Sequence, residues 1–207
     1  MPMADIDPKL VMELRRRTGL PMMECKSALV ASEGDIAKAE DWLRKQGEKV
    51  AASKAGRSAK EGRIGAYLHH NGKIGVMVEV LCEDDFAARN EIFQDFIKKV
   101  SMHIAAAVPA PVAVTREGVS ADLVAKEREI AQGQLDADPK NAKKPADIRL
   151  KIVEGKVNAF YKERVLLEQA WVMDPAQTVD QVLKATIQKL GQNIIIRRFS
   201  RLEVGAE

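Results

Sequence analysis

The sequence is poor in aromatic residues and in cysteine, and it has no long apolar run. Aromatic residues make up only 4% of the 207 residues, which argues against the base-stacking platforms of single-strand nucleic-acid binders. Cys25 and Cys82 lie far apart and form no CxxC motif, so neither a disulfide framework nor a zinc ribbon is indicated. No stretch reaches the ~18 consecutive apolar residues expected of a membrane span. We therefore expect no direct contact with nucleic acid or membrane.

A strong excess of charge of either sign is also missing. The chain has 33 Lys and Arg against 30 Asp and Glu, a net charge of +3, which is well short of a nucleic-acid footprint. The N-terminal MPMADIDPKL carries acids early and lacks the apolar run of a secretory signal. With 46% hydrophobic residues the chain can bury a core, and its length predicts one ordinary domain plus a small appendage. These features predict a cytoplasmic protein.

Motifs for covalent chemistry are absent as well, since the sequence contains no GxSxG, HExxH or P-loop. His69 and His70 are adjacent in a predicted strand, so they should point to opposite faces and not share a metal ion. His103 is a lone histidine in a predicted helix. We therefore expect neither an enzyme nor a bound metal or other cofactor.

The first 47 residues predict three short helices. Asp7 and Asp35 are placed as N-caps of the first and third helices, and Pro21 opens the second. Three glycines are expected to end the helices: Gly19, Gly34 and Gly47. Residues 48–62 are small and basic, and they predict a solvated linker that is partly helical because of its alanines, with a phosphate-tracking arm as the less favoured alternative.

From residue 63 the hydrophobic period changes. RIGAYLHH and KIGVMVEVLC are separated by Asn71-Gly72, a strong hairpin signal, and the terminal NIIIRRFSRLEV predicts another strand. Helices are expected over residues 86–107, 121–135, 148–169 and 179–190, and Asp174-Pro175 is expected to form a turn. One apolar stripe is predicted on the first of these helices: Phe86, Phe93, Phe96, Ile97, Val100 and Ile104. The pattern predicts an α+β fold with a small antiparallel sheet packed by helices.

CEDDFAARNEIF, residues 82–93, places consecutive acids directly before an aromatic residue. Asp84 or Asp85 can cap the helix that follows, but one cap explains only one acid. A Mg²⁺ site is poorly supported because no phosphate cradle accompanies the acids. Phe86 lies in the first turn, where a side chain can project from the end of the element. An exposed acid–aromatic tip therefore stands as a third possibility.

Met22 and Met23 stand side by side at the start of the second predicted helix. Neighbours on a helix diverge by roughly 100°, so both side chains cannot point fully inward. At least one should be partly exposed, as part of an adaptable apolar contact surface. Packing in the core is an equally weighted alternative.

Three parts of the sequence together resemble the bacterial elongation factor Ts family, in the right order and over nearly the whole chain. LRRRTGLPMMECKSAL with GDIAKAEDWLRKQG is similar to the family's ubiquitin-associated-like N-terminal domain. HHNGKIGVMVEVLCEDDFAARNEIF is similar to its core hairpin and Thr-Asp-Phe-Val segment, and IVEGKVNAFYKERVLLEQ with IIIRRFSRLEVG to its later core and terminus. The resemblance implies a ubiquitin-associated-like three-helix domain at 1–47, a basic linker at 48–62, and an α+β core and dimerisation domain at 63–207.

The resemblance also implies a function, namely guanine-nucleotide exchange on elongation factor Tu without covalent chemistry. Asp85 and Phe86 match the Asp and Phe that act on the Mg²⁺ region of the partner GTPase. Asp84 stands where the family has Thr, and Ala87 where it has Val, so these four residues form the expected wedge. Three N-terminal positions match contacts with the partner's nucleotide-binding domain: Arg15, Met22 and Met23.

The chain is short for this family. Longer members carry an inserted helical hairpin and a second core half, neither of which is found in the sequence. The chain therefore resembles the compact form, a homodimer that completes its core between subunits and forms a 2:2 complex with elongation factor Tu. The alternative is an adaptor that docks a protein or RNA without changing nucleotide affinity, which would not need Asp85 and Phe86. A carboxylate-based metal enzyme is a distant third, since it would need ligands beyond residues 83–85.

Overall fold

The computed structural model describes residues 6–142 and 144–206. The chain folds into two compact units, each built from several segments. Unit 1 contains the chain up to residue 63, residues 80–97 and residues 181–195, and unit 2 contains residues 64–79, 98–180 and 196 onward. The sequence instead predicted successive domains along the chain, divided near residues 47 and 62.

Three helices begin unit 1, as predicted: α1 (Pro8–Thr18), α2 (Met22–Ala31) and α3 (Ile36–Lys54). The side chains of Asp7 and Asp35 cap α1 and α3, and Gly19 ends α1 in the left-handed conformation with φ 67°. One apolar cluster holds these helices together: Val11, Leu14, Leu20, Cys25, Ala28, Leu29, Ala39 and Leu43.

The prediction that Gly47 ends the third helix is wrong, because α3 continues through Gly47 to Lys54. Gly47 is buried, and a Cβ atom there would come within 2.7 Å of the Gln188 side-chain oxygen on α9 (Val179–Leu190). The glycine thus allows another helix to approach closely. Residues 48–54, predicted as linker, are helical.

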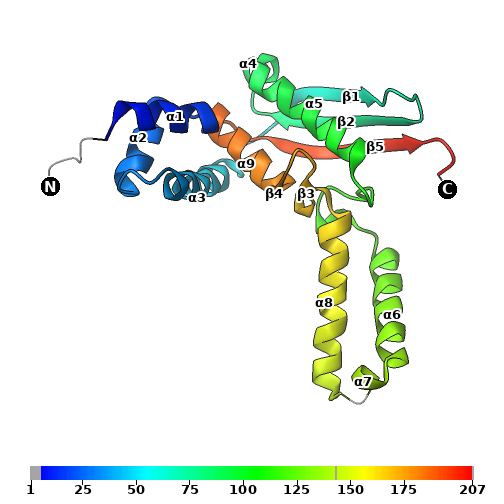
Figure 1. Cartoon of the computed structure of the whole chain (residues 1–207). Helices are drawn as coiled ribbons and strands as arrows, with labels where there is room; N and C mark the ends of the chain where they lie inside the picture. The colour runs from blue at the N-terminus through cyan, green and yellow to red at the C-terminus, as the bar shows by residue number, and fades with distance from the viewer. Residues whose placement is uncertain (1–5, 143, 207) are drawn as a thin grey trace. The chain divides into compact units, whose positions relative to one another are not determined.

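The main sheet has the order β1-β2-β5, with strands β1 (Glu61–Leu68), β2 (Ile74–Cys82) and β5 (Ile195–Glu203). The predicted hairpin and C-terminal strand are confirmed, and Figure 1 shows β5 running beside β2. At the hairpin turn Gly72 has φ 68°, and the Lys73 amide donates to the Asn71 side chain. The α+β fold is confirmed.

The helix predicted from residue 86 is two helices, α4 (Asp85–Arg89) and α5 (Glu91–Ala106). Asn90 interrupts them with extended dihedrals, φ −66° and ψ 135°, and its side chain accepts the Ile92 amide at 2.8 Å. The stripe from Phe93 to Ile104 is buried as predicted. Phe86 does not belong to it, because it lies on the separate helix α4 and is exposed.

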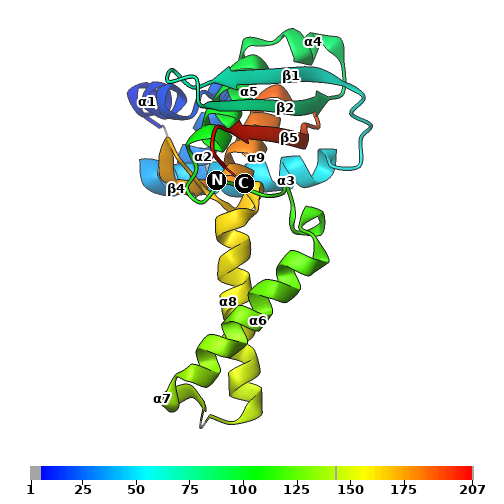
Figure 2. The same cartoon turned by 90° about the vertical axis from the view of Figure 1, so that its right-hand side faces the viewer.

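In unit 2, α6 (Ala121–Ala137) and α8 (Ala146–Arg164) lie side by side as a helical hairpin, with α7 (Pro139–Ala142) near its tip (Figures 1 and 2). Ala131, Leu135 and Val153 form its buried seam. The sequence predicted both helices but not their pairing into a hairpin. The pairing was missed because it depends on contacts between separate helices, and neither helix carries a marked apolar face.

The rest of unit 2 includes a small second sheet of β3 (Ala170–Trp171) and β4 (Asp174–Thr178) and two short 3₁₀ turns, Arg116–Gly118 and Leu166–Glu168. The predicted turn at Asp174-Pro175 is wrong, since Asp174 already pairs with Trp171. Proline is tolerated there because β4 is an edge strand. None of the helices in the described part of the chain combines the length and apolar character needed to cross a membrane.

His69 and His70 do not lie in a strand, because β1 ends at Leu68. Strand alternation therefore does not apply to them, and their ring centroids are 4.2 Å apart instead of lying on opposite faces. Within residues 6–142 and 144–206, no three His, Cys, Asp or Glu side chains are placed to hold a metal ion together.

Candidate functional site

The short helix α4 presents one large exposed aromatic side chain. Asp84, in extended conformation two residues after the end of β2, caps α4 by accepting the Ala87 amide at 2.8 Å. The helix therefore starts directly after the strand, and Phe86 is its second residue. The Phe86 side chain is 89% exposed, although a phenylalanine is normally among the most buried residues of a protein. Two of the three possibilities left open by the sequence, the helix cap and the exposed tip, are therefore present together.

Glu83 and Asp84, at the base of the tip, are held by the loop that follows α9. Glu83 accepts the Asn193 backbone amide at 2.6 Å and lies 3.4 Å from the Arg57 guanidinium. The second carboxylate oxygen of Asp84 accepts the Gln192 side-chain amide at 2.6 Å. The Ala87 amide, followed by the Gln192 amide, lowers the pKa of Asp84, because both donate to its ionised form. The carboxylate is therefore charged at neutral pH.

Asp85 and Ala87 differ in where they lie. Asp85 is exposed and pairs with Arg89 at 2.6 Å, one helical turn along α4. Ala87 is buried and offers its backbone amide to the cap. Among the four predicted wedge residues, only Asp85 and Phe86 thus face outward. Glu83, Asp84 and Asp85 each bind a donor group of the protein itself. The arrangement therefore stabilises the tip and does not form a cation site.

Cys82, the last residue of β2, is buried beneath the tip. Its thiol donates to the Asp84 carbonyl at 3.2 Å, and burial raises its pKa. A protonated thiol is a weak donor and a poor nucleophile, so Cys82 has a structural place here.

The N-terminal candidates lie on the surface of unit 1. Met22 and Met23, at the start of α2, are 47% and 71% exposed, and Arg15 is exposed in the last turn of α1. The alternative that both methionines pack in the core is therefore wrong. Two flexible thioether side chains at a helix start form an adaptable apolar surface.

Sequence reasoning missed three residues of the tip: Arg57, Gln192 and Asn193. A helix was predicted over residues 179–190, and Gly191 follows it with φ 67°, but nothing in the sequence indicated which residues the next loop would reach. Polar residues after a helix stop are common, so their pairing with an acid about 110 positions away gave no local signal.

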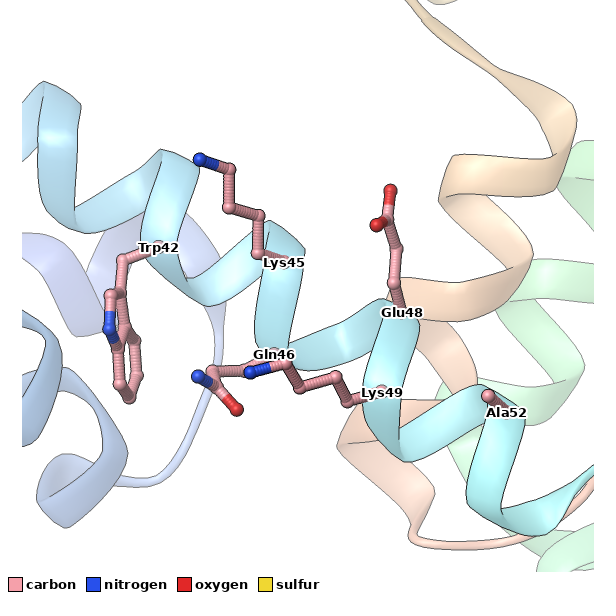
Figure 3. Close-up of a pocket in the computed structure, with 6 residues that line it drawn as sticks. All are labelled: Trp42, Lys45, Gln46, Glu48, Lys49 and Ala52. Atoms are coloured by element: carbon pink, nitrogen blue, oxygen red, sulfur yellow. The ribbon is translucent and has the colours of Figure 1, made fainter.

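A groove with a volume of about 480 Å³ runs along α3. It is lined by Trp42, Lys45, Gln46, Glu48, Lys49 and Ala52 (Figure 3). The two ammonium groups and the carboxylate project to different places instead of toward one another (Figure 3). Trp42 packs partly against the helical core, so the groove is explained by side-chain packing along one helix.

Comparison with known proteins gives consistent matches. The family model described as elongation factor TS matches residues 22–206. The chain is 52% identical over 203 residues to an "Elongation factor Ts" of Anaeromyxobacter sp., covering 98% of this chain and 90% of the relative. It is 50% identical over 200 residues to that of Caldanaerobacter subterraneus, covering 97% of both chains. It is 47% identical over 201 residues to that of Fervidobacterium nodosum, covering 97% of this chain and 99% of the relative.

Proposed function

The chain belongs to the elongation factor Ts family of translation elongation factors, and we propose that it is a guanine-nucleotide exchange factor for elongation factor Tu. The observation that supports this proposal most strongly is the exposed Phe86 on a tip braced by Glu83 and Asp84. The protein would act in the cytoplasm, where translation takes place.

An exchange factor works without making or breaking covalent bonds. It binds the nucleotide-free GTPase more tightly than the nucleotide-bound form. By thermodynamic reciprocity it must then weaken nucleotide binding by the same factor. The protein therefore needs a group that competes with the arrangement holding the nucleotide, and further contacts that supply binding energy.

Phe86 is proposed as the competing group. Its ring would enter an apolar slot of elongation factor Tu and displace the element around Mg²⁺, with Asp85 beside it. Mg²⁺ demands near-octahedral geometry, so a small displacement should loosen the metal and the phosphates it holds. Burying one Phe side chain is worth roughly 1.5–3 kcal/mol, or about 10- to 150-fold in an equilibrium constant.

Arg15, Met22 and Met23 are proposed to hold the partner's nucleotide-binding domain. Their exposure on α1 and α2 leaves them accessible to a second protein. Once these contacts form, insertion of Phe86 becomes an intramolecular step at high effective concentration. Loss of a holding contact should therefore weaken binding more than it lowers the maximal exchange rate.

We also propose that the protein is a homodimer that binds two copies of elongation factor Tu. One side of the sheet in unit 2 carries exposed apolar residues, with Ile64 57%, Leu68 70% and Met77 57% exposed. Such a face favours burial against another apolar surface. Size-exclusion chromatography with light scattering tests this proposal, and a mass of 22.8 kDa at micromolar concentration would reject it.

The exchange proposal is tested with elongation factor Tu loaded with fluorescent GDP and chased with excess unlabelled GDP. Adding the purified chain should accelerate the fluorescence change in a saturable way. An adaptor would bind elongation factor Tu and leave the release rate unchanged. That result would replace the exchange proposal by the adaptor alternative.

A further inference from the structure

The loop after α9 holds both carboxylates at the base of the Phe86 tip. Asn193 donates its backbone amide to Glu83 at 2.6 Å, and Gln192 donates its side-chain amide to Asp84 at 2.6 Å. These bonds join segments of unit 1 that lie more than a hundred residues apart in the sequence.

Asn193 ties a third segment to the same place. Its buried side chain donates to the backbone carbonyls of Arg57 at 2.8 Å and Ala55 at 3.5 Å, just after α3. The end of α3, the exit of β2 and the end of α9 therefore meet at two neighbouring residues. Asn193 organises this junction, while Gln192 is the residue that reaches into α4.

The short helix α4 cannot fix its own direction. It has only five residues, and an isolated helix of that length is unstable in water. Phe86 adds no packing of its own because it is exposed, so only the small side chains of Ala87 and Ala88 seat α4 against the unit. The remaining constraint comes from polar bonds at its two ends: those of Asp84 at its start, and at its end the Gln94 side-chain amide, which donates to the Arg89 carbonyl at 2.9 Å.

The two carboxylate oxygens of Asp84 accept hydrogen bonds from different groups. One accepts the Ala87 amide as the helix cap, and the other accepts the Gln192 amide. A threonine at this position could cap the helix with its single oxygen but would offer nothing comparable to Gln192. The Gln192 side-chain oxygen is meanwhile buried with no hydrogen-bond partner among the described residues. The bond from the Gln192 side-chain nitrogen to Asp84 is thus the interaction that holds this amide group.

We propose that Gln192 is a positioning residue that acts through Asp84 to fix the direction in which α4 presents Phe86. The inference rests on the proposed exchange function, which it deepens. Gln192 touches neither nucleotide nor metal in this account. It sets the fraction of bound complexes in which the exposed ring faces the apolar slot of elongation factor Tu.

The test is a double-mutant cycle on Gln192→Leu and Asp84→Thr in the full-length chain, using release of fluorescent GDP from elongation factor Tu. Each variant should lower the maximal stimulated rate by about three- to tenfold, the range expected for loss of one typical intramolecular hydrogen bond. The concentration for half-maximal stimulation should change by less than about twofold, since the holding contacts are intact. The double variant should be no worse than either single variant, because both remove the same bond.

Asp84→Asn is the conservative rescue. It keeps an oxygen for the cap, and its amide can donate to the Gln192 oxygen once the Gln192 side chain turns over. It should keep a rate near that of the unmodified protein. Gln132→Leu is the matched control, because it removes another glutamine amide bound to a carboxylate, that of Asp136 in α6, at 3.1 and 3.2 Å. It should leave the rate unchanged.

The inference is overturned if Gln192→Leu keeps the full rate while Phe86→Ala loses it. It is also overturned if the rate of the double variant is lowered by the product of the two single-variant losses. A Gln132→Leu loss equal to that of Gln192→Leu would also overturn it. If the unmodified chain does not stimulate release at all, the proposed function itself fails, which is a distinguishable result. Should Gln192→Leu not fold, Asp84→Thr against Asp84→Asn makes the same comparison.

Discussion

Phe86→Ala should separate function from stability, because the side chain that it removes is exposed in the folded protein. The ring is 89% exposed, so its removal takes almost no apolar surface out of the folded core. Surface changes of this kind usually alter stability by no more than about 0.5 kcal/mol. For a chain of this length that corresponds to a melting-temperature shift of at most about 2 °C.

Phe93→Ala is the matched control, seven residues further along. Phe93 is fully buried in α5, and truncating a buried Phe costs about 3–5 kcal/mol. Its melting temperature should fall by roughly 6–20 °C. The two substitutions remove the same group, yet only the buried one should destabilise the fold.

The effect of Phe86→Ala should appear instead in nucleotide exchange. If the ring is buried in elongation factor Tu during exchange, its loss removes roughly 1.5–3 kcal/mol, which lowers stimulated GDP release by about 10- to 150-fold. Complex formation should remain detectable, because Arg15, Met22 and Met23 are untouched. Fluorescent-GDP release at saturating factor measures the rate, and a binding titration checks the complex. Unchanged stimulation by a correctly folded Phe86→Ala protein would refute the wedge role.

Three further predictions concern other parts of the molecule. Arg15→Ala and Met23→Ala should each weaken binding to elongation factor Tu with a smaller effect on the maximal exchange rate, and normal binding isotherms for both would remove α1 and α2 from the interface. Burial lowers the pKa of His103 in the folded protein. Its contribution to stability is therefore complete above its ordinary pKa of about 6.5 and is lost as the pH falls through its lower folded-state pKa. Between pH 7.5 and 5, the measured free energy of unfolding should fall more steeply in the unmodified protein than in His103→Gln. Gly62→Ala should be strongly destabilising, because its Cβ would lie 2.2 Å from a β2 carbonyl oxygen. Gly133→Ala in α6 meets open space and should stabilise the protein by about 0.5–1 kcal/mol. Equal melting temperatures for the two variants would contradict this prediction.

The sequence was sufficient to predict those helix ends and turns that are marked by capping or turn residues in the same short segment. The caps Asp7 and Asp35, the stop at Gly19 and the Asn71-Gly72 hairpin all follow from residues next to one another in the sequence, and each is confirmed. Helix geometry also indicated that at least one of Met22 and Met23 would be partly exposed, with core packing as the alternative, and both are exposed.

Features that depend on distant segments were not predictable in this way. Gly47 looked like a helix end, but its role is set by Gln188 on a helix far along the chain. Phe86 fitted a helical stripe by spacing, but the break at Asn90 puts it on a separate helix, α4, and not on α5 with the rest of the stripe. Likewise, Gln192 and Asn193 gained their place at the tip through tertiary contacts that leave no periodic pattern.

The central claim is that this protein and GDP oppose each other's binding to elongation factor Tu, and the measurement that tests it most directly is a linkage experiment. The affinity of elongation factor Tu for GDP is measured with and without saturating factor, and its affinity for the factor with and without saturating GDP. We predict that both affinities weaken, and by the same factor. A stable complex in which the GDP affinity is unchanged would contradict the account.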